Sequence, residues 1–207
     1  GGEWRRAKDG ATYPVINPAT EEVVDHVPLG GAEDVEEAVR VAKEAFLPWS
    51  KRDFEERGEV LRQGIEILKA HREEIVETLT REQGKPLHEA QGEFDHLLHG
   101  LAYYADLATK IRGVYQPLPS RFGPSYGLVI KRPIGVVAAI VPWNFPLTLM
   151  GTKIGPALAA GNTIVVKPAS TTPLATLKVV GYLNEAGLPP GVLNVVTGPG
   201  RTVGRPW

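Results

Sequence analysis

The first thirty residues alternate between apolar and polar positions in two short runs. Residues 12–16 and 22–27 carry β-branched and aromatic side chains, and the turn-forming pairs Asn17-Pro18 and Gly30-Gly31 follow them. Runs of this kind, bounded by Asn, Pro and Gly, are typical of strands. The pattern predicts a short antiparallel hairpin at the amino-terminal end of the chain.

From residue 33 the apolar positions recur every three or four residues, which is the period of an α-helix. The first helix is predicted to start at residue 33, where acidic side chains favour the helix dipole, and to end at Pro48. A second helical stretch covers residues 54–84 and ends at a glycine followed by a proline. It is either one helix or two helices that break near His71. A third helix is predicted over residues 87–111.

The helical period stops between residues 114 and 133, where prolines, glycines and alternating apolar residues appear. The stretch Tyr-Gly-Leu-Val-Ile at 126–130 is typical of an extended chain. We expect strands here that leave the helical body. A strand edge without a partner is prone to association with another chain.

The last third of the chain alternates short apolar runs with helical stretches. The apolar runs lie at 135–141, 163–167 and 193–197, and helical patterns at 146–160 and 173–186 separate them. Continuously apolar strands that alternate with helices favour a parallel sheet covered on both faces. The sequence therefore predicts an α/β fold, in which a helical segment precedes the first half of a doubly wound, Rossmann-like sheet. Ligands of such sheets bind beyond the carboxyl ends of the strands.

Charge and hydropathy exclude several classes of partner. Lys and Arg number 23 and Asp and Glu number 24, so the formal net charge is −1 and no excess of charge favours a nucleic acid. The longest apolar runs, such as 134–141, are about eight residues long, well short of the roughly 20 needed to cross a bilayer. No secretory signal is visible, so we expect a cytoplasmic protein without nucleic-acid or membrane partners.

The 207 residues include no cysteine, which excludes disulfides, thiolate metal sites and cysteine catalysis by these residues alone. The five histidines show no metal-binding spacing, and we expect no metal site. Carboxylates are plentiful on the helix faces, but no loop-borne pair supports a carbohydrate or metal hydrolase.

The three predicted strands of the sheet end in unusual turns. The first turn reads Pro-Trp-Asn-Phe-Pro at 142–146, the second Lys-Pro-Ala-Ser at 167–170, and the third Gly-Pro-Gly-Arg-Thr-Val-Gly at 198–204. The first places a neutral amide, Asn144, in a turn stiffened by two prolines, which suits a donor to an oxyanion. An isolated Asn in such a place more often caps a helix. The third turn departs from the dinucleotide fingerprint by one residue, so it does not count as a match to that motif.

These turns, in this order and spacing, resemble the aldehyde dehydrogenase superfamily. Further matches follow in the family's order: Ile-Asn-Pro-Ala-Thr at 16–20, Glu-Gln-Gly-Lys-Pro at 82–86, Gly-Pro-Ala-Leu-Ala-Ala-Gly-Asn at 155–162 and Gly-Leu-Pro-Pro-Gly-Val at 187–192. The resemblance implies an NAD(P)-dependent enzyme that oxidises an aldehyde to a carboxylic acid. In that chemistry a cysteine thiolate attacks the aldehyde carbon, hydride leaves to the nicotinamide, and a base-activated water hydrolyses the thioester.

The resemblance also assigns roles to residues of the turns. Asn144 corresponds to the family's side-chain donor to the thiohemiacetal oxyanion, and Lys167 to the lysine that hydrogen-bonds the adenosine ribose. Ser170 stands where NAD-preferring members often carry a glutamate that repels a 2′-phosphate, so we hypothesise that NADP is accepted. The other expected contacts to the cofactor, NAD or NADP, are Ile140, Val141, Pro142, Trp143, Pro168, Ala169, Gly200 and Gly204.

In the family's pattern, the nucleophilic cysteine, the general-base glutamate and the second half of the sheet would all follow residue 207. We therefore expect residues 1–113 to form the hairpin and helices of a cofactor-binding domain, 114–133 an extension that joins subunits of a homo-oligomer, and 134–207 the first half of the cofactor sheet, without a catalytic domain. The resemblance also implies that a helix starts at residues 205–207, and Pro206 would disfavour its continuation.

Two interpretations remain open. In the first, the chain is the amino-terminal part of an aldehyde dehydrogenase whose activity belongs to a longer parent. In the second, it is a stand-alone, non-catalytic module that binds a nucleotide or associates through its strands, and the lack of cysteine supports it.

Overall fold

A short antiparallel hairpin stands at the amino-terminal end, as predicted. The computed structural model describes residues 2–119, 121 and 123–204, and in it β1 (Thr12–Ile16) pairs with β2 (Val23–Pro28). Val15 and Val27 of this hairpin pack against Leu174 in a small apolar cluster. The hairpin is thereby fastened to the start of a helix far along the chain.

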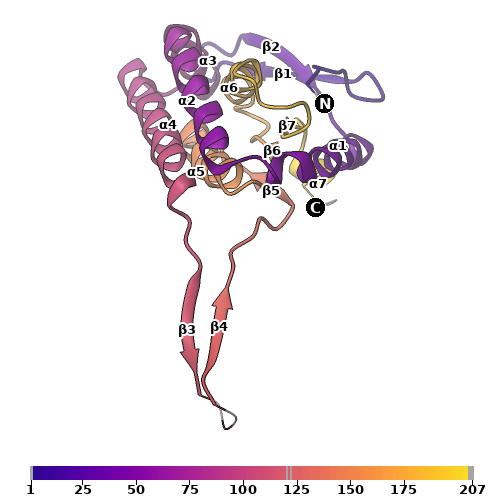
Figure 1. Cartoon of the computed structure of the whole chain (residues 1–207). Coiled ribbons are helices and arrows are strands. Elements are labelled where there is room, and N and C mark those ends of the chain that lie inside the picture. The colour runs from indigo at the N-terminus through magenta and orange to yellow at the C-terminus, as the bar shows by residue number, and fades with distance from the viewer. Residues whose placement is uncertain (1, 120, 122, 205–207) are drawn as a thin grey trace.

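Helices follow the hairpin, and the first of them lies across the body from the next three (Figure 1). The stretch predicted over 54–84 is two helices, because the backbone at His71 leaves the helical conformation, with φ −107° and ψ 19°. The third predicted helix ends before residue 111, and a 3₁₀ turn continues it. The elements are α1 (Ala32–Ser50), α2 (Phe54–Ala70), α3 (Arg72–Gln83), α4 (Leu87–Leu107) and the turn η1 (Ala108–Lys110).

The prediction that Pro48 ends the first helix is wrong, since α1 continues to Ser50. Pro48 lacks a backbone N–H and therefore removes one helical hydrogen bond, but only two residues of α1 follow it. Trp49 is fully buried in the main core and holds this turn in place. Burial of a large apolar side chain contributes roughly 2–3 kcal/mol, whereas one hydrogen bond contributes about 1 kcal/mol.

The predicted parallel sheet occupies the last third of the described chain. Its strands stand in the order β5–β6–β7, so the strand that comes first in the sequence lies at an edge. This is the order of one half of a doubly wound sheet. The strands are β5 (Val136–Ile140), β6 (Thr163–Lys167) and β7 (Leu193–Val195), and the connecting helices are α5 (Pro146–Ala159) and α6 (Leu174–Glu185).

Helices cover both faces of the central strand β6. Ile164 and Val166 lie in the main core, to which α5 and α6 contribute. Val165, which points to the opposite face, packs against Val35 and Ala42 of α1. The α/β fold class with a doubly wound half-sheet is confirmed.

Two details of the sheet differ from the prediction. β7 ends at Val195 because the chain then turns toward the hairpin, where Thr197 Oγ1 donates to the Pro28 carbonyl (2.6 Å). β5 is not covered on both sides, and Ile140 is 52% exposed. Within the described residues no strand pairs with the outer edge of β5.

A short helix, α7 (Gly200–Val203), ends the described part of the chain. Pro206, which the sequence analysis predicted to stop a helix, lies outside the described residues. None of the described helices is long and apolar enough to cross a membrane.

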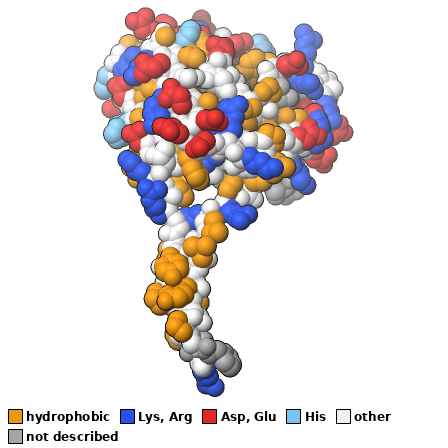
Figure 2. All heavy atoms as spheres, viewed as in Figure 1, with side chains coloured by type: hydrophobic (Ala, Val, Ile, Leu, Met, Phe, Trp, Pro, Cys, Tyr) orange, Lys and Arg blue, Asp and Glu red, His pale blue; other side chains and the backbone are white. Residues whose placement is uncertain are grey.

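The predicted strands between 114 and 133 form an arm that leaves the body (Figure 1). The arm consists of β3 (Val114–Leu118) and β4 (Ser125–Val129), which pair antiparallel. Tyr115 and Tyr126 stack on it with ring centroids 5.2 Å apart, yet they remain 66% and 58% exposed. Figure 2 shows apolar side chains along the face of the arm that it displays. The arm therefore presents an apolar surface to solvent.

Candidate functional site

The turns that follow β5, β6 and β7 lie at one edge of the sheet, because the strands are parallel. Ser170 Oγ donates a hydrogen bond to the Gly198 carbonyl (3.0 Å) and so joins the second turn to the third. Val141 N–H donates to the Lys167 carbonyl (3.0 Å), which keeps the first turn beside the second. The structure thus brings together the three segments that the sequence analysis singled out.

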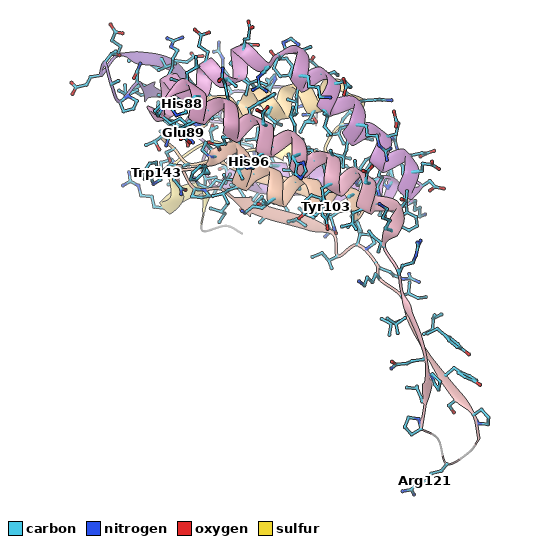
Figure 3. All side chains as sticks on the ribbon, turned by 90° about the vertical axis from the view of Figure 1, so that its left-hand side faces the viewer. His88, Glu89, His96, Tyr103, Arg121 and Trp143 are labelled. Carbon is cyan, nitrogen blue, oxygen red and sulfur yellow. The ribbon has the colours of Figure 1, made fainter. Side chains whose placement is uncertain are left out.

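The first turn exposes most of its side chains. Val141 is buried, whereas Trp143 is 59% exposed and Asn144 is also exposed. Figure 3 shows Trp143 at the end of the body away from the arm. Pro146 occupies the start of α5, a position where the missing N–H of proline costs no hydrogen bond.

Lys167 ends β6 and is buried, with 4% of its surface exposed. Its Nζ donates to the Pro168 carbonyl (2.9 Å), and an ammonium group can donate three hydrogen bonds. Burial lowers the pKa of Lys167, because the charged form loses hydration. This side chain is therefore not a solvated surface lysine, and it retains donors for a polar ligand.

The rest of the second turn is less enclosed. Pro168 is buried, and Ala169 and Ser170 are half-buried. Residue 170 presents a hydroxyl group whose proton is directed to Gly198. The oxygen of this hydroxyl keeps its capacity to accept a hydrogen bond.

Two side chains that the sequence analysis missed hold the first turn. Glu93 Oε1 accepts hydrogen bonds from the backbone N–H groups of Leu147 (2.7 Å) and Thr148 (3.2 Å) at the start of α5. A carboxylate there satisfies N–H groups that have no partner within the helix and interacts favourably with the helix dipole. The other carboxylate oxygen pairs with Lys85, whose Nζ also donates to the Asn144 carbonyl (3.2 Å).

The helix after the second turn starts in the same way. Glu82 accepts hydrogen bonds from the N–H groups of Leu174 (2.6 Å) and Ala175 (2.8 Å). Burial raises the pKa of Glu82 to about 8, although the two N–H donors favour its ionised form. Buried acids from α3 and α4 therefore fix the first turns of α6 and α5.

A signal for both acids is present in the sequence. Glu82 continues the helical spacing of the buried residues Ile75 and Leu79, and Glu93 falls beside the buried Ala90. An acid on the apolar stripe of a helix needs a buried hydrogen-bond partner. The presence of an acid on an apolar stripe therefore indicates that Glu82 and Glu93 form buried hydrogen bonds, although it does not identify their partners.

The glycines of the third turn have different roles. Gly198 has φ +142°, and a Cβ there would lie 2.6 Å from Val203 Cγ2, so this position requires glycine. Gly198 is not among the cofactor contacts predicted from the sequence. A Cβ at Gly204 would meet the Gly200 carbonyl oxygen at 2.5 Å, which is a packing reason for that glycine. At Gly200 no described atom lies within 4 Å of such a Cβ, so its surface is open to a ligand.

Nearly the whole chain, residues 4–206, matches the aldehyde dehydrogenase family. The chain belongs to this family. The resemblance drawn from the three turns and the other matching segments is thereby confirmed.

Relatives of this aldehyde dehydrogenase chain are similar over nearly its full length. The mitochondrial succinate-semialdehyde dehydrogenase of Arabidopsis thaliana is 43% identical over 204 residues, which cover 99% of this chain and 38% of that protein. A succinate-semialdehyde dehydrogenase of Escherichia coli (strain K12), whose name specifies NADP(+), is 40% identical over 204 residues. These residues cover 99% of this chain and 42% of that protein. A betaine aldehyde dehydrogenase from Staphylococcus aureus, solved in complex with NAD+, gives a TM-score of 0.91 at 37% identity, over 98% of this chain and 40% of that one.

The chain thus spans about 40% of the length of these relatives. Among them, one is named for NADP(+) and another was solved with NAD+. The cofactor of these two relatives is therefore a nicotinamide dinucleotide.

Proposed function

We propose that this chain is the amino-terminal, cofactor-binding part of an NAD(P)-dependent aldehyde dehydrogenase, which oxidises an aldehyde to a carboxylic acid. The observation that carries the proposal is the meeting of three turns at one sheet edge, with the buried ammonium of Lys167 in one and the exposed amide of Asn144 in another. Residues 134–207 would form the first half of the cofactor sheet and residues 1–113 the part that supports it. The cysteine nucleophile and general base would come from sequence beyond these 207 residues.

The chemistry of the turns fits the proposed cofactor. Lys167 Nζ uses one donor on Pro168 and has others for a ribose hydroxyl. Ile140 and Trp143 offer exposed apolar surface, and Gly200 leaves room for close approach. The nicotinamide, when bound, accepts hydride from the aldehyde carbon.

Asn144 would act on the aldehyde. In the proposed reaction, attack of a cysteine thiolate on the aldehyde creates an oxyanion, and the Asn144 side-chain N–H donates a hydrogen bond to it. One such donor contributes about 3 kcal/mol of transition-state stabilisation. The exposed side chain, on a backbone that Lys85 holds, supports this role.

Between the two cofactors, we propose that NADP is accepted. Residue 170 carries a neutral hydroxyl hydrogen-bonded to Gly198, so no fixed negative charge at this position repels a 2′-phosphate. An acid at this position would repel it.

Calorimetric titration of the 207-residue chain with NADP and with NAD tests the proposal. We expect saturable binding of NADP that Lys167→Met weakens at least roughly tenfold, because a charge-assisted hydrogen bond is lost. Lys43→Met, at an exposed lysine on α1, is the matched control and should leave the affinity unchanged. Absence of binding, or equal affinity of Lys167→Met and the unmodified chain, would contradict the proposal.

The second candidate function is a stand-alone module that binds a nucleotide or a partner without catalysis. The absence of cysteine from the chain favours it. Intact mass of the purified protein and aldehyde-dependent formation of NAD(P)H separate the two candidates. Turnover by a longer natural polypeptide that contains this chain supports the enzyme, whereas a natural protein of only 22.4 kDa that binds cofactor without turnover supports the module.

We also propose that the arm β3–β4 joins subunits of a homo-oligomer. Leu128 and Tyr115 on the arm are 68% and 66% exposed, and both strands carry an outer edge without a partner in the described structure. Apolar strand edges of this kind readily pair with a second copy of the same chain.

A further inference from the structure

The ammonium group of Lys85 is engaged by three neighbours. Its side chain is 9% exposed and pairs with the carboxylate of Glu93, whose side chain is fully buried. The same Nζ donates to the Asn144 carbonyl (3.2 Å) and lies 4.5 Å from the centre of the Phe145 ring. A cation over an aromatic face is attracted to it. Lys85 is therefore committed to the first turn of the candidate site and is not a solvated surface lysine.

The loop that carries Lys85 is held firmly between α3 and α4. Gly84 ends α3 in the left-handed conformation, with φ +85°, which a glycine adopts without strain. A Cβ at Gly84 would lie 2.7 Å from Pro18 Cγ, so the turn of the amino-terminal hairpin closes directly on this loop. The fold thus determines where the ammonium group lies.

This ion pair holds the backbone at Asn144 and just after it. Lys85 binds the Asn144 carbonyl, and Glu93 binds the N–H groups of Leu147 and Thr148. Because a peptide unit is planar, fixing this carbonyl also fixes the N–H of Phe145 and restricts ψ of Asn144. The Asn144 side chain stays exposed.

We infer that Lys85 is a positioning residue for Asn144, and that Glu93 supplies the charge that keeps it in place. By holding the main-chain carbonyl, Lys85 sets the direction in which the Asn144 amide leaves the backbone. The inference rests on the oxyanion role proposed above for Asn144. A methionine at 85 has no hydrogen-bond donor for the carbonyl. It also leaves the Glu93 carboxylate buried without a counter-charge, which is unfavourable.

Nuclear magnetic resonance of the ¹⁵N-labelled 207-residue chain tests the inference at the peptide bond concerned. The readout is the order parameter of the Phe145 amide, which shares a peptide plane with the Asn144 carbonyl. Lys85→Met alone would strand a buried charge, so the main variant combines Lys85→Met with Glu93→Gln. The Gln side-chain oxygen can still accept the N–H groups at the start of α5. Lys85→Arg retains the charge and tests rescue, and Lys43→Met is the control.

In the unmodified chain we expect an order parameter of about 0.85 at Phe145, as in rigid backbone. In the double variant it should fall below about 0.6, while the amides of β6 stay rigid. Lys85→Arg should restore most of the order, and Lys43→Met should leave it unchanged. Three outcomes would overturn the inference, because each removes the specific link to Asn144. The order parameter at Phe145 could stay unchanged in the double variant, or it could fall equally in Lys85→Arg. The loss of order could also extend through β6.

Titration of the same samples with NADP separates this inference from the proposed function. If the unmodified chain binds no cofactor while Phe145 order depends on Lys85, the proposed function fails and the positioning contact stands. If cofactor binds and Phe145 order is independent of Lys85, only the positioning inference fails.

Discussion

Ser170 Oγ donates a hydrogen bond to the main-chain carbonyl of Gly198, 28 residues further along the chain, at a distance of 3.0 Å. This contact ties the turn after β6 to the glycine-rich turn after β7. The two turns form one surface, and the side chain at 170 sets the charge at their junction. Exchange of this hydroxyl for a carboxylate changes that charge without the loss of a buried apolar contact, because Ser170 is only half-buried.

Ser170→Glu should therefore lower the affinity for NADP relative to NAD by roughly tenfold or more, because two negative charges are brought together in a partly enclosed site. Calorimetric titration of both cofactors measures the ratio. Thr152→Glu, which adds the same charge at an exposed position on α5, is the control and should leave the ratio unchanged. If Ser170→Glu leaves the ratio of the NADP and NAD affinities unaltered, the proposed role of this residue is wrong.

Glu82 should make the stability of the chain depend on pH. Burial raises its pKa to about 8 from the usual 4.5, so between these values the folded state binds a proton that the unfolded state releases. The free energy of unfolding contributed by this group is therefore present below about pH 4.5 and falls as the pH rises toward about 8. Denaturant unfolding over this range should show the decline in the unmodified chain and its loss in Glu82→Gln.

Glu77→Gln, at an exposed acid on the same helix, is the control for that comparison and should keep the decline. If the unmodified chain and Glu82→Gln change with pH in parallel, Glu82 is ionised in the folded state throughout this range.

Gly198→Ala should destabilise the chain by roughly 1–3 kcal/mol or more, since the residue must adopt a conformation that side chains disfavour. The added Cβ would also lie 2.6 Å from Val203 Cγ2 and 2.8 Å from the Gly30 carbonyl oxygen. Gly200→Ala meets no described atom within 4 Å and should change stability by less than about 1 kcal/mol. Thermal unfolding compares the two, and equal effects would count against the packing role of Gly198.

In the complete dehydrogenase that we propose, Asn144→Ala should lower kcat by about 10²–10³. The double variant Lys85→Met with Glu93→Gln should lower kcat on the order of tenfold, with little change in KM for the aldehyde. In the Asn144→Ala background the same double variant should have little further effect, because positioning matters only while the amide is present. Steady-state kinetics of the four proteins gives this coupling, and independent, multiplicative effects would exclude it.

Changes on the arm should alter the state of association rather than the fold. Tyr126→Ser with Leu128→Ser removes two exposed apolar side chains of β4 and should convert an oligomer into monomers in light scattering. Leu47→Ser, at a 57% exposed residue of α1, is the control and should leave the mass unchanged. A monomeric unmodified chain, or an arm variant that keeps its mass, would argue against the proposed subunit contact.

Local patterns predicted most of the elements correctly. The period of the apolar positions and the residues of the turns located β1, β6 and the start of α5 at the residues where the structure has them. Both signals act over a few residues, so they do not depend on the rest of the fold. The error at Pro48 arose because the burial of Trp49, a contact with the distant core, decides where α1 ends.

By itself, the sequence determined the type and order of the elements, the family to which the chain belongs, and the three turns that carry the candidate site. Only the tertiary structure decided which side chains hold those turns. Glu93 reaches Leu147 across 54 residues, and Glu82 reaches Leu174 across 92 residues. These hydrogen-bond partners depend on how α3 and α4 pack beside α5 and α6. The spacing of apolar residues along the chain does not predict that packing. The acids were visible on apolar stripes, but the backbone N–H groups that bind them became known only from the three-dimensional arrangement of the helices.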